Sequence, residues 1–310
     1  MKTKIGLVAV ALILAISSLF TGCAPEAGAL GLITVGTKNS TEQYVVGNLM
    51  KLLLEEHGFD VTLKTGRASG MMREALEKGD IDLCMEYTGT VWLSYAEHLY
   101  WGETPEELYQ KAKTYDAEKG IIWLNPIWCN NTHAIAVTRE FSGENGVTTL
   151  SDLAEYVREH KGKVPIAIDF EFYTRPDFLN FQIHYEVAFH PDYVRAVMHG
   201  LTPDYLIRGE VDACMVFGTD SIIVKNDWIV LEDDKRFFPP YDLCPNVREE
   251  ALEKYPQLED ILDSLVAAFP QEPAAARKAM TELNAKVDID KTRPEDAARE
   301  WLIAKGLITG

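Results

Sequence analysis

Two ten-residue stretches, Lys78–Tyr87 (KGDIDLCMEY) and Arg208–Phe217 (RGEVDACMVF), decide the predicted fold. Each begins with a basic residue and a glycine, continues through an acidic turn and ends as an apolar strand that finishes in an aromatic side chain. Glycine at this place is a frequent left-handed cap of a helix carboxyl end. A helix, a glycine and a strand therefore recur in the two halves of the chain, as two similar α/β lobes require.

Upstream of the first repeat the chain alternates strands and helices. Ser40 and Gln43 form a capping-box pattern, and apolar residues follow at helical spacing until Gly58. The pattern predicts strands at 32–35, 59–64 and 81–87, with helices between Ser40 and Gly58 and at 71–78. Strand, helix, strand, helix, strand is an α/β pattern that favours parallel pairing.

The second half continues in the same style. The predicted strands are 134–137, 164–169, 211–217 and 228–231, and the predicted helices are 151–160, capped by Ser151-Asp152, 177–187, 203–207 and several between 247 and 305. Tyr87 and Phe217 then stand at the carboxyl ends of parallel strands, where open α/β sheets bind ligands. If the two lobes face each other, both aromatic side chains lie on one crevice.

The amino terminus carries an export signal. Lys2 and Lys4 precede an apolar run at 5–20, and Gly22-Cys23 follows, which is the order of a secretory signal peptide. The run is shorter than the roughly 20 residues that span a bilayer. We expect residues 1–23 to be a lipoprotein signal with Cys23 lipidated, and 24–31 to be a flexible tether. An ordinary soluble signal peptide with a chance cysteine is the alternative. Either way the mature protein is expected outside the cytoplasm, and lipidation would anchor it to a membrane.

Charge excludes one class of partner. Removal of residues 1–22 takes away two lysines and leaves 28 basic against 48 acidic residues, a net charge of −20. Nucleic-acid binding needs Lys and Arg to neutralise phosphates, so no nucleic-acid partner is expected.

The cysteines and histidines suggest no metal site, because no CxxC or clustered His/Cys pattern is present. Four cysteines remain after the signal, and their three possible full pairings stay open beside buried free thiols. They are Cys84, Cys129, Cys214 and Cys244. No Ser-His-Asp arrangement, Gly-rich phosphate loop or paired carboxylates emerge, so neither an enzyme nor a cofactor is predicted.

Several short motifs carry a family resemblance, and they keep their order along residues 32–309. They are Gly36–Gln43 (GTKNSTEQ), Glu86–Thr90 (EYTGT), Arg175–Asp177 (RPD), Thr219–Ser221 (TDS), Leu231–Lys235 (LEDDK) and Pro239–Tyr241 (PPY). Together they resemble the glycine betaine/carnitine/choline-binding family of osmoprotectant ABC importers. The resemblance implies a type II periplasmic-binding-protein fold of two α/β lobes. Its two hinge crossings are expected near 131–133 and 217–219, with lobe 1 at 32–131 and 218–310 and lobe 2 at 132–217.

The resemblance also implies a ligand site. A quaternary ammonium has no N–H to donate, so aromatic faces recognise it through their negative quadrupoles. The implied aromatic box is Tyr87, His133, Tyr205 and Phe217, and the implied polar contacts are Lys38, Thr90 and Arg175, whose guanidinium suits a carboxylate. Where the family usually has tyrosine, this chain has His133 and Phe217. Without the resemblance, Tyr87 and Phe217 are core aromatics, Tyr205 an ordinary helix residue and His133 a loop histidine.

The predicted function is a monomeric binding protein that delivers glycine betaine to an ABC permease and its ATPase. The same fold and role with choline, carnitine, ectoine or another small amine or zwitterion stays open, as does a ligand-sensing receptor module. Because a protonated imidazole repels a cation, His133 leads to the hypothesis that affinity falls below about pH 6.

Overall fold

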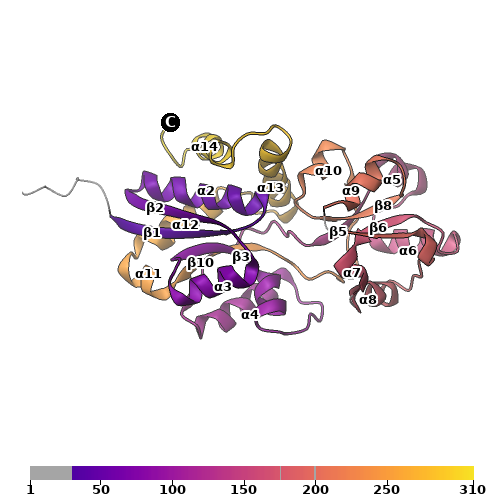
Figure 1. Cartoon of the computed structure of the whole chain (residues 1–310), viewed down its shortest axis with the longest axis horizontal. Coiled ribbons are helices and arrows are strands. Elements are labelled where there is room, and N and C mark those ends of the chain that lie inside the picture. The colour runs from indigo at the N-terminus through magenta and orange to yellow at the C-terminus, as the bar shows by residue number, and fades with distance from the viewer. Residues whose placement is uncertain (1–29, 175, 199) are drawn as a thin grey trace, which may run out of the picture.

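The chain folds into two α/β lobes that lie side by side along the long axis of the molecule (Figure 1). The computed structural model describes residues 30–174, 176–198 and 200–310. Each lobe is built on its own five-stranded sheet. The predicted two-lobed α/β architecture is therefore confirmed.

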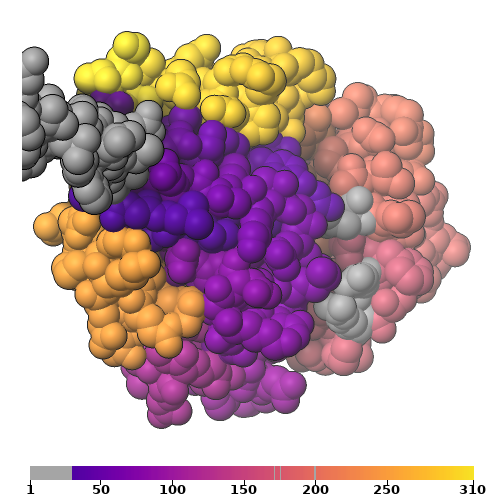
Figure 2. All heavy atoms as spheres, turned by 60° about the vertical axis from the view of Figure 1, so that its left-hand side comes forward, coloured from indigo at the N-terminus to yellow at the C-terminus, as the bar shows by residue number. Residues whose placement is uncertain are grey.

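The first sheet combines strands from both ends of the chain. Across it the strands follow in the order β2 (Phe59–Arg67), β1 (Gly31–Lys38), β3 (Leu83–Tyr87), β10 (Leu243–Arg248) and β4 (Ile121–Trp123). β1 pairs in parallel with β2 and β3, and β10 runs antiparallel between β3 and β4. The helices of this lobe are α2 (Thr41–Glu56), α3 (Ser69–Lys78), the π-helical turn η1 (Thr90–Tyr95), α4 (Pro105–Ala117), α11 (Glu249–Lys254), α12 (Gln257–Ala267), α13 (Pro273–Asp288) and α14 (Pro294–Ala304). Figure 2 shows the yellow C-terminal part lying directly on the violet N-terminal part.

The second sheet is formed by the middle of the chain. Its strand order is β7 (Val194–Val197), β6 (Ile166–Asp169), β8 (Ala213–Phe217), β5 (His133–Val137) and β9 (Ile229–Val230). β6 is parallel to both of its neighbours, and β5 is antiparallel to β8 and β9. The helices are α5 (Arg139–Asn145), α6 (Leu150–Glu159), α7 (Phe170–Thr174), α8 (Pro176–His184), the 3₁₀ turn η2 (Pro191–Tyr193), α9 (Thr202–Ile207) and α10 (Ser221–Lys225). Both sheets are mixed, so parallel pairing is only part of the arrangement.

The repeated unit folds as its sequence predicts. Gly79 ends α3 with φ of 79° and Gly209 follows α9 with φ of 67°, both in the left-handed region that glycine adopts without steric cost. β3 and β8 then run to Tyr87 and Phe217, which are the last residues of their strands. The two aromatic side chains thus occupy equivalent places in the two lobes.

Local capping departs from the sequence expectations at two helices. The Ser40 side chain accepts a hydrogen bond from the backbone N–H of Gln43 at 3.4 Å, but the Gln43 side chain accepts from Lys38 and does not close the box. At α6 the cap is Thr149 instead of the predicted Ser151-Asp152. Thr149 Oγ1 accepts from the N–H of Asp152 and the Asp152 carboxylate accepts from the N–H of Thr149, which is a complete capping box.

Some elements were not predicted at all, among them β4, β7, β10 and α4. β10 occupies 243–248, and its last two residues fall where the sequence predicts the first of a series of helices, from 247 on. Its first five residues are buried, but Pro245 and Asn246 interrupt the apolar pattern, and both residue types are unfavourable inside a strand.

The chain crosses between the lobes twice, and the two crossings lie side by side. The N–H of Asn131 donates to the carbonyl of Tyr241 at 2.9 Å, and Thr132 Oγ1 donates to the carbonyl of Pro239 at 2.7 Å. The first crossing is therefore at 130–132, close to the predicted 131–133, and the return crossing is at 239–241.

The return crossing corrects the prediction at 217–219 and the assignment of 218–238 to lobe 1. β9 pairs with β5, and Leu231 and Phe238 pack in the core of the second lobe. After Phe217 the chain only turns at the junction, then re-enters the second lobe through α10. The strand at 228–231 was predicted, but its place in the second sheet depends on pairing with β5, far along the chain, which local pattern does not show.

All four cysteines of the described chain are free and buried. Burial raises the pKa of each thiol, which keeps it protonated and unreactive. The alternatives left open by the sequence thus resolve to free thiols at Cys84, Cys129, Cys214 and Cys244.

Candidate functional site

A cavity of about 330 Å³ lies where the two lobes and the crossings meet. Its walls come from the ends of β1 and β3, the starts of α2 and α10, the first crossing and α13. The lining residues are Lys38, Ser40, Thr41, Glu42, Ser69, Tyr87, Thr90, Asn131, Phe217, Thr219, Asp220, Ser221, Tyr241, Asn284 and Asp288. Both lobes contribute, and Tyr87, Phe217, Lys38 and Thr90 are the predicted site residues that it brings together.

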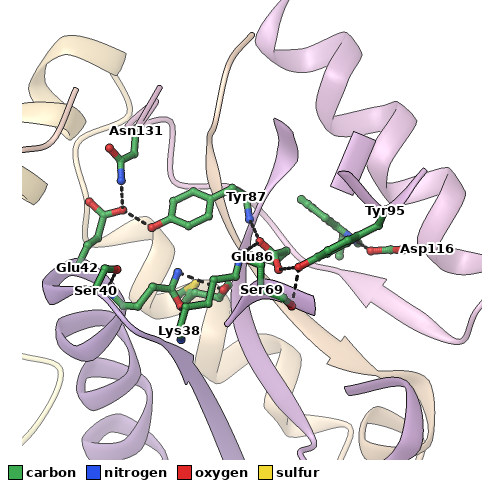
Figure 3. Close-up of polar contacts among 12 residues, drawn as sticks. Lys38, Ser40, Glu42, Ser69, Glu86, Tyr87, Tyr95, Asp116 and Asn131 are labelled. Carbon is green, nitrogen blue, oxygen red and sulfur yellow. Dashed lines mark hydrogen bonds and ion pairs between the residues drawn. The ribbon is translucent and has the colours of Figure 1, made fainter. Parts of the chain in front are cut away.

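Tyr87 is the most firmly fixed aromatic residue of the cavity. It is 8% exposed, and its hydroxyl donates to Glu42 Oε1 at 2.7 Å (Figure 3). Burial, the charge of Glu42 and this hydrogen bond raise the pKa of Tyr87 well above its usual range. The hydroxyl therefore stays protonated and donating, and the ring is held in one orientation.

Lys38 is held by an acidic partner. Its ammonium forms a buried ion pair with Glu86 Oε1 and lies 5.1 Å from the centre of the Tyr87 ring. Glu86 also accepts the backbone N–H of Tyr87 at 2.8 Å and the hydroxyl of Tyr95 at 3.2 Å (Figure 3). Since Glu86 already balances its charge, Lys38 is a weaker partner for a ligand carboxylate than the sequence suggests.

Phe217 supplies the second lobe's aromatic face. Its backbone N–H donates to Asp220 Oδ2 at 2.8 Å, which fixes the turn after β8. His133 pairs with it across the sheet, with the ring centres 4.9 Å apart and the planes at 30°. His133 lines a different cavity of about 420 Å³, and of these two residues only Phe217 lines the candidate site.

Tyr205 is the second predicted box residue, after His133, that lies outside this cavity. Its ring packs beside a small apolar cluster around Leu206 and Trp228, and the Arg208 guanidinium lies over it at 4.7 Å. α9 thus turns this side chain toward the body of the second lobe. Arg175 and Cys23 lie outside the described residues.

Tyr241 is a lining aromatic residue that was not predicted as part of the box. Its ring crosses Gly89 so closely that a Cβ at Gly89 would lie 2.8 Å from two ring carbons. Burial, followed by the nearby charges of Asp177 and Glu86, raises the pKa of Tyr241 to about 12. The sequence did contain a sign of this role, because Tyr241 is the last residue of the Pro239–Tyr241 motif that carries the family resemblance.

The polar lining of the cavity is acidic. Among the described lining residues three are acids, Glu42, Asp220 and Asp288, and one is a base, Lys38. With the Lys38 charge taken up by Glu86, which is not a lining residue, the surplus is negative. A concave site with aromatic faces and excess carboxylate favours a cationic group.

Two kinds of feature are absent from the residues that the structure describes. No three or more His, Cys, Asp or Glu side chains in residues 30–310, apart from the gaps at 175 and 199, are grouped so that they could hold a metal ion. Over the same residues no helix has both the length and the apolar character needed to cross a membrane.

Two mixed α/β sheets in two lobes, two adjacent crossings and a cavity between them define a two-lobed solute-binding protein of the periplasmic type. The model of the family OpuAC, described as the substrate binding domain of the ABC-type glycine betaine transport system, matches residues 31–304. The chain belongs to this family, which consists of binding proteins and not enzymes.

Similar proteins support the same assignment. A glycine-betaine-binding protein of Pseudomonas aeruginosa is 31% identical over 297 residues, covering 94% of this chain and 92% of that protein. An ergothioneine transport permease/ergothioneine binding protein of Helicobacter pylori is 32% identical over 278 residues, but the match spans only 48% of its length. The structure of apo YehZ from Escherichia coli superposes with a TM-score of 0.75 at 29% identity, covering 89% of this chain and 99% of that one.

The family defines the general role. The chain is the extracytoplasmic substrate-binding component of a quaternary amine ABC importer and works with the other components of that transporter.

Proposed function

We propose that this protein binds a small quaternary-ammonium osmolyte, with glycine betaine as the leading candidate, and delivers it to an ABC permease. The observation that carries the proposal is that Tyr87 and Phe217, one from each lobe, line one acidic cavity. The trimethylammonium group lies between the two ring faces, near Glu42. A relative of P. aeruginosa with 31% identity is named for the same ligand.

The energetics require the lobes to close. Two ring faces at roughly 1–2 kcal/mol each contribute about 2–4 kcal/mol. Association alone costs at least about 4 kcal/mol, and micromolar affinity needs about −8 kcal/mol. Further contacts must therefore form on closure. The proposed ones are Tyr205 for the cation, and Arg175 and Thr90 for the carboxylate.

Choline is the second candidate, and the charge balance favours it. Lys38 is already paired with Glu86, and the described lining has a surplus of carboxylates. A carboxylate on the ligand therefore depends on Arg175. Choline has no carboxylate and carries a net positive charge, so it avoids that requirement.

Calorimetry separates these ligands. The mature protein is titrated with glycine betaine, choline, carnitine and ergothioneine, and glycine betaine is expected to bind most tightly. Arg175→Ala should weaken glycine betaine by about tenfold, the loss of a charge-assisted hydrogen bond, and leave choline nearly unchanged. Choline binding more tightly than glycine betaine selects the second candidate. No binding by any of the four contradicts the proposal.

Lipid anchoring by Cys23 is a separate part of the proposal. After export, cleavage before Cys23 and acylation of its thiol would leave 24–31 as the tether between membrane and first lobe. Mass spectrometry of the mature amino terminus tests this, with an acylated Cys23 expected. A Cys23→Ala variant should move to the soluble fraction, and an unmodified wild-type terminus contradicts anchoring.

A further inference from the structure

The carboxylate of Glu42 joins parts of the molecule that are far apart in sequence. Glu42 lies in the first turn of α2 and is only 4% exposed. Oε1 accepts from the Tyr87 hydroxyl at 2.7 Å and from Asn131 Nδ2 at 3.1 Å (Figure 3). Oε2 accepts from Thr219 Oγ1 at 2.6 Å and from Asn284 Nδ2 at 3.2 Å. These four donors fill the acceptor sites of a carboxylate.

Two of the four donors lie at the junction between the lobes. Asn131 lies in the first crossing, and Thr219 lies in the turn by which the second lobe reaches the junction. Asn284 also donates to the carbonyl of Thr219 at 3.1 Å, so α13 holds the same turn. Thr219 is 2% exposed, which shields its bond to Glu42 from competing water.

A second acidic contact lies beside the first but is exposed to solvent. Asp288 accepts from Thr41 Oγ1 at 2.7 Å and from Ser221 Oγ at 2.9 Å, again joining α2 to the second lobe. Because Asp288 is exposed, water screens and replaces its hydrogen bonds easily. It provides a matched control for the buried contact.

We propose that Glu42 is a positioning residue that couples the ring of Tyr87 to the joint between the lobes. It fixes the ring through one oxygen and the second lobe through the other. A ligand that presses on Tyr87 therefore acts on the same carboxylate that sets the inter-lobe angle. The ligand role of Tyr87 rests on the proposed function, whereas the hold on the joint does not.

The first test measures the joint without ligand. Spin labels at Glu118→Cys, just after α4, and Glu155→Cys, in α6, report the distance between the lobes in a Cys23→Ser background. The four described cysteines are buried and spare the labels. Glu42→Gln places an amide donor against existing donors and should widen the distance distribution. Asp288→Asn and Glu55→Gln, an exposed change on α2, should leave it close to wild type.

The second test measures the coupling. Tyr87→Phe and Thr219→Val each remove one hydrogen bond to Glu42 and keep the shape of the replaced side chain nearly unchanged. These two variants can test the proposal even if Glu42→Gln does not fold. In a double-mutant cycle, the effects of the two substitutions on ligand affinity and on the unliganded distance distribution should be non-additive. The affinity of the double mutant should differ by threefold or more from the value expected if the two single effects were independent.

Two results would overturn the proposal. One is an unliganded distribution that Glu42→Gln and Thr219→Val leave unchanged. The other is strict additivity of Tyr87→Phe and Thr219→Val. If none of the four ligands tested by calorimetry binds, the proposed function is contradicted. The inter-lobe distances of the unliganded variants, compared in the same double-mutant cycle, still decide the role of Glu42.

Discussion

The two walls of the cavity are built differently. On the first lobe Tyr87, Lys38 and Glu42 are all buried, and each is fixed by hydrogen bonds or an ion pair to another buried side chain. On the second lobe Phe217 is half-buried and rests against the ring of His133. The first wall is preorganised by polar contacts, and the second presents an apolar face.

The difference suggests a division of labour. A preorganised wall loses little entropy on binding, so we expect the first lobe to select the cation. On the proposed function the second lobe adds its contacts when the lobes approach, so we expect it to determine how long the ligand is held. Variants of the first wall should change affinity most, and variants of the second wall should act chiefly on dissociation.

The largest effect is expected at Tyr87. Tyr87→Ala removes a ring face and leaves a buried carboxylate without one of its donors. Affinity for glycine betaine should fall about 100-fold, or about 2.7 kcal/mol, from the cation–π and hydrogen-bond losses together. Calorimetry checks this, with Tyr109→Phe, far from the cavity, as a control. A loss below fivefold would contradict the role of the first wall.

A smaller effect on affinity is expected from the second wall. Phe217→Ala should weaken binding about tenfold through faster dissociation, by the loss of one ring face worth roughly 1–2 kcal/mol. Tyr205→Ala should cost less than Phe217→Ala, since Tyr205 must first move from its packed position beside Arg208. Stopped-flow kinetics separates association from dissociation. A Tyr205 effect larger than that of Phe217 would show that closure rebuilds the second wall.

A buried carboxyl group next to the return crossing should make the stability of the protein depend on pH. Asp242, next to the return crossing, is 1% exposed, and burial raises its pKa to about 7 although the N–H of Asn130 donates to it. The folded state therefore binds a proton more readily than the unfolded state, and this contribution to stability is present at low pH and lost as pH rises through about 7.

Asp242→Asn should abolish the loss of stability at high pH, because the amide does not ionise. Its free energy of unfolding should exceed that of the wild type by on the order of 1–2 kcal/mol at pH 8, and the gain should vanish near pH 4. Urea denaturation at the two pH values measures the difference. An equal effect at both would show that the Asp242 carboxyl does not titrate as its burial requires.

The smallest effect is expected at His133. Because Phe217, and not His133, lines the cavity, lowering the pH from 7.5 to 5.5 should weaken the binding of a cation through His133 by less than about threefold. His133→Phe should remove that part of the pH dependence, which also separates it from the titration of Asp242. A tenfold fall in the wild type that His133→Phe abolishes would place His133 against the ligand.

The sequence predicted what depends on local pattern. The repeat at Lys78–Tyr87 and Arg208–Phe217 located both strand ends, and the Pro239–Tyr241 motif marked the crossing, although its role was not recognised. β10 was missed because its pairing is with β3 and β4, far along the chain. Glu42 was missed as well, since a first-turn acid on a helix is usually a dipole partner at the surface. Its four donors come together only in the fold.

A crystal structure of the protein with glycine betaine tests the central claim most directly. We predict the trimethylammonium nitrogen within about 6 Å of the ring centres of both Tyr87 and Phe217, the distance at which a cation interacts with an aromatic face. A nitrogen bound away from these two rings, or a ligand in the cavity behind His133, would contradict it.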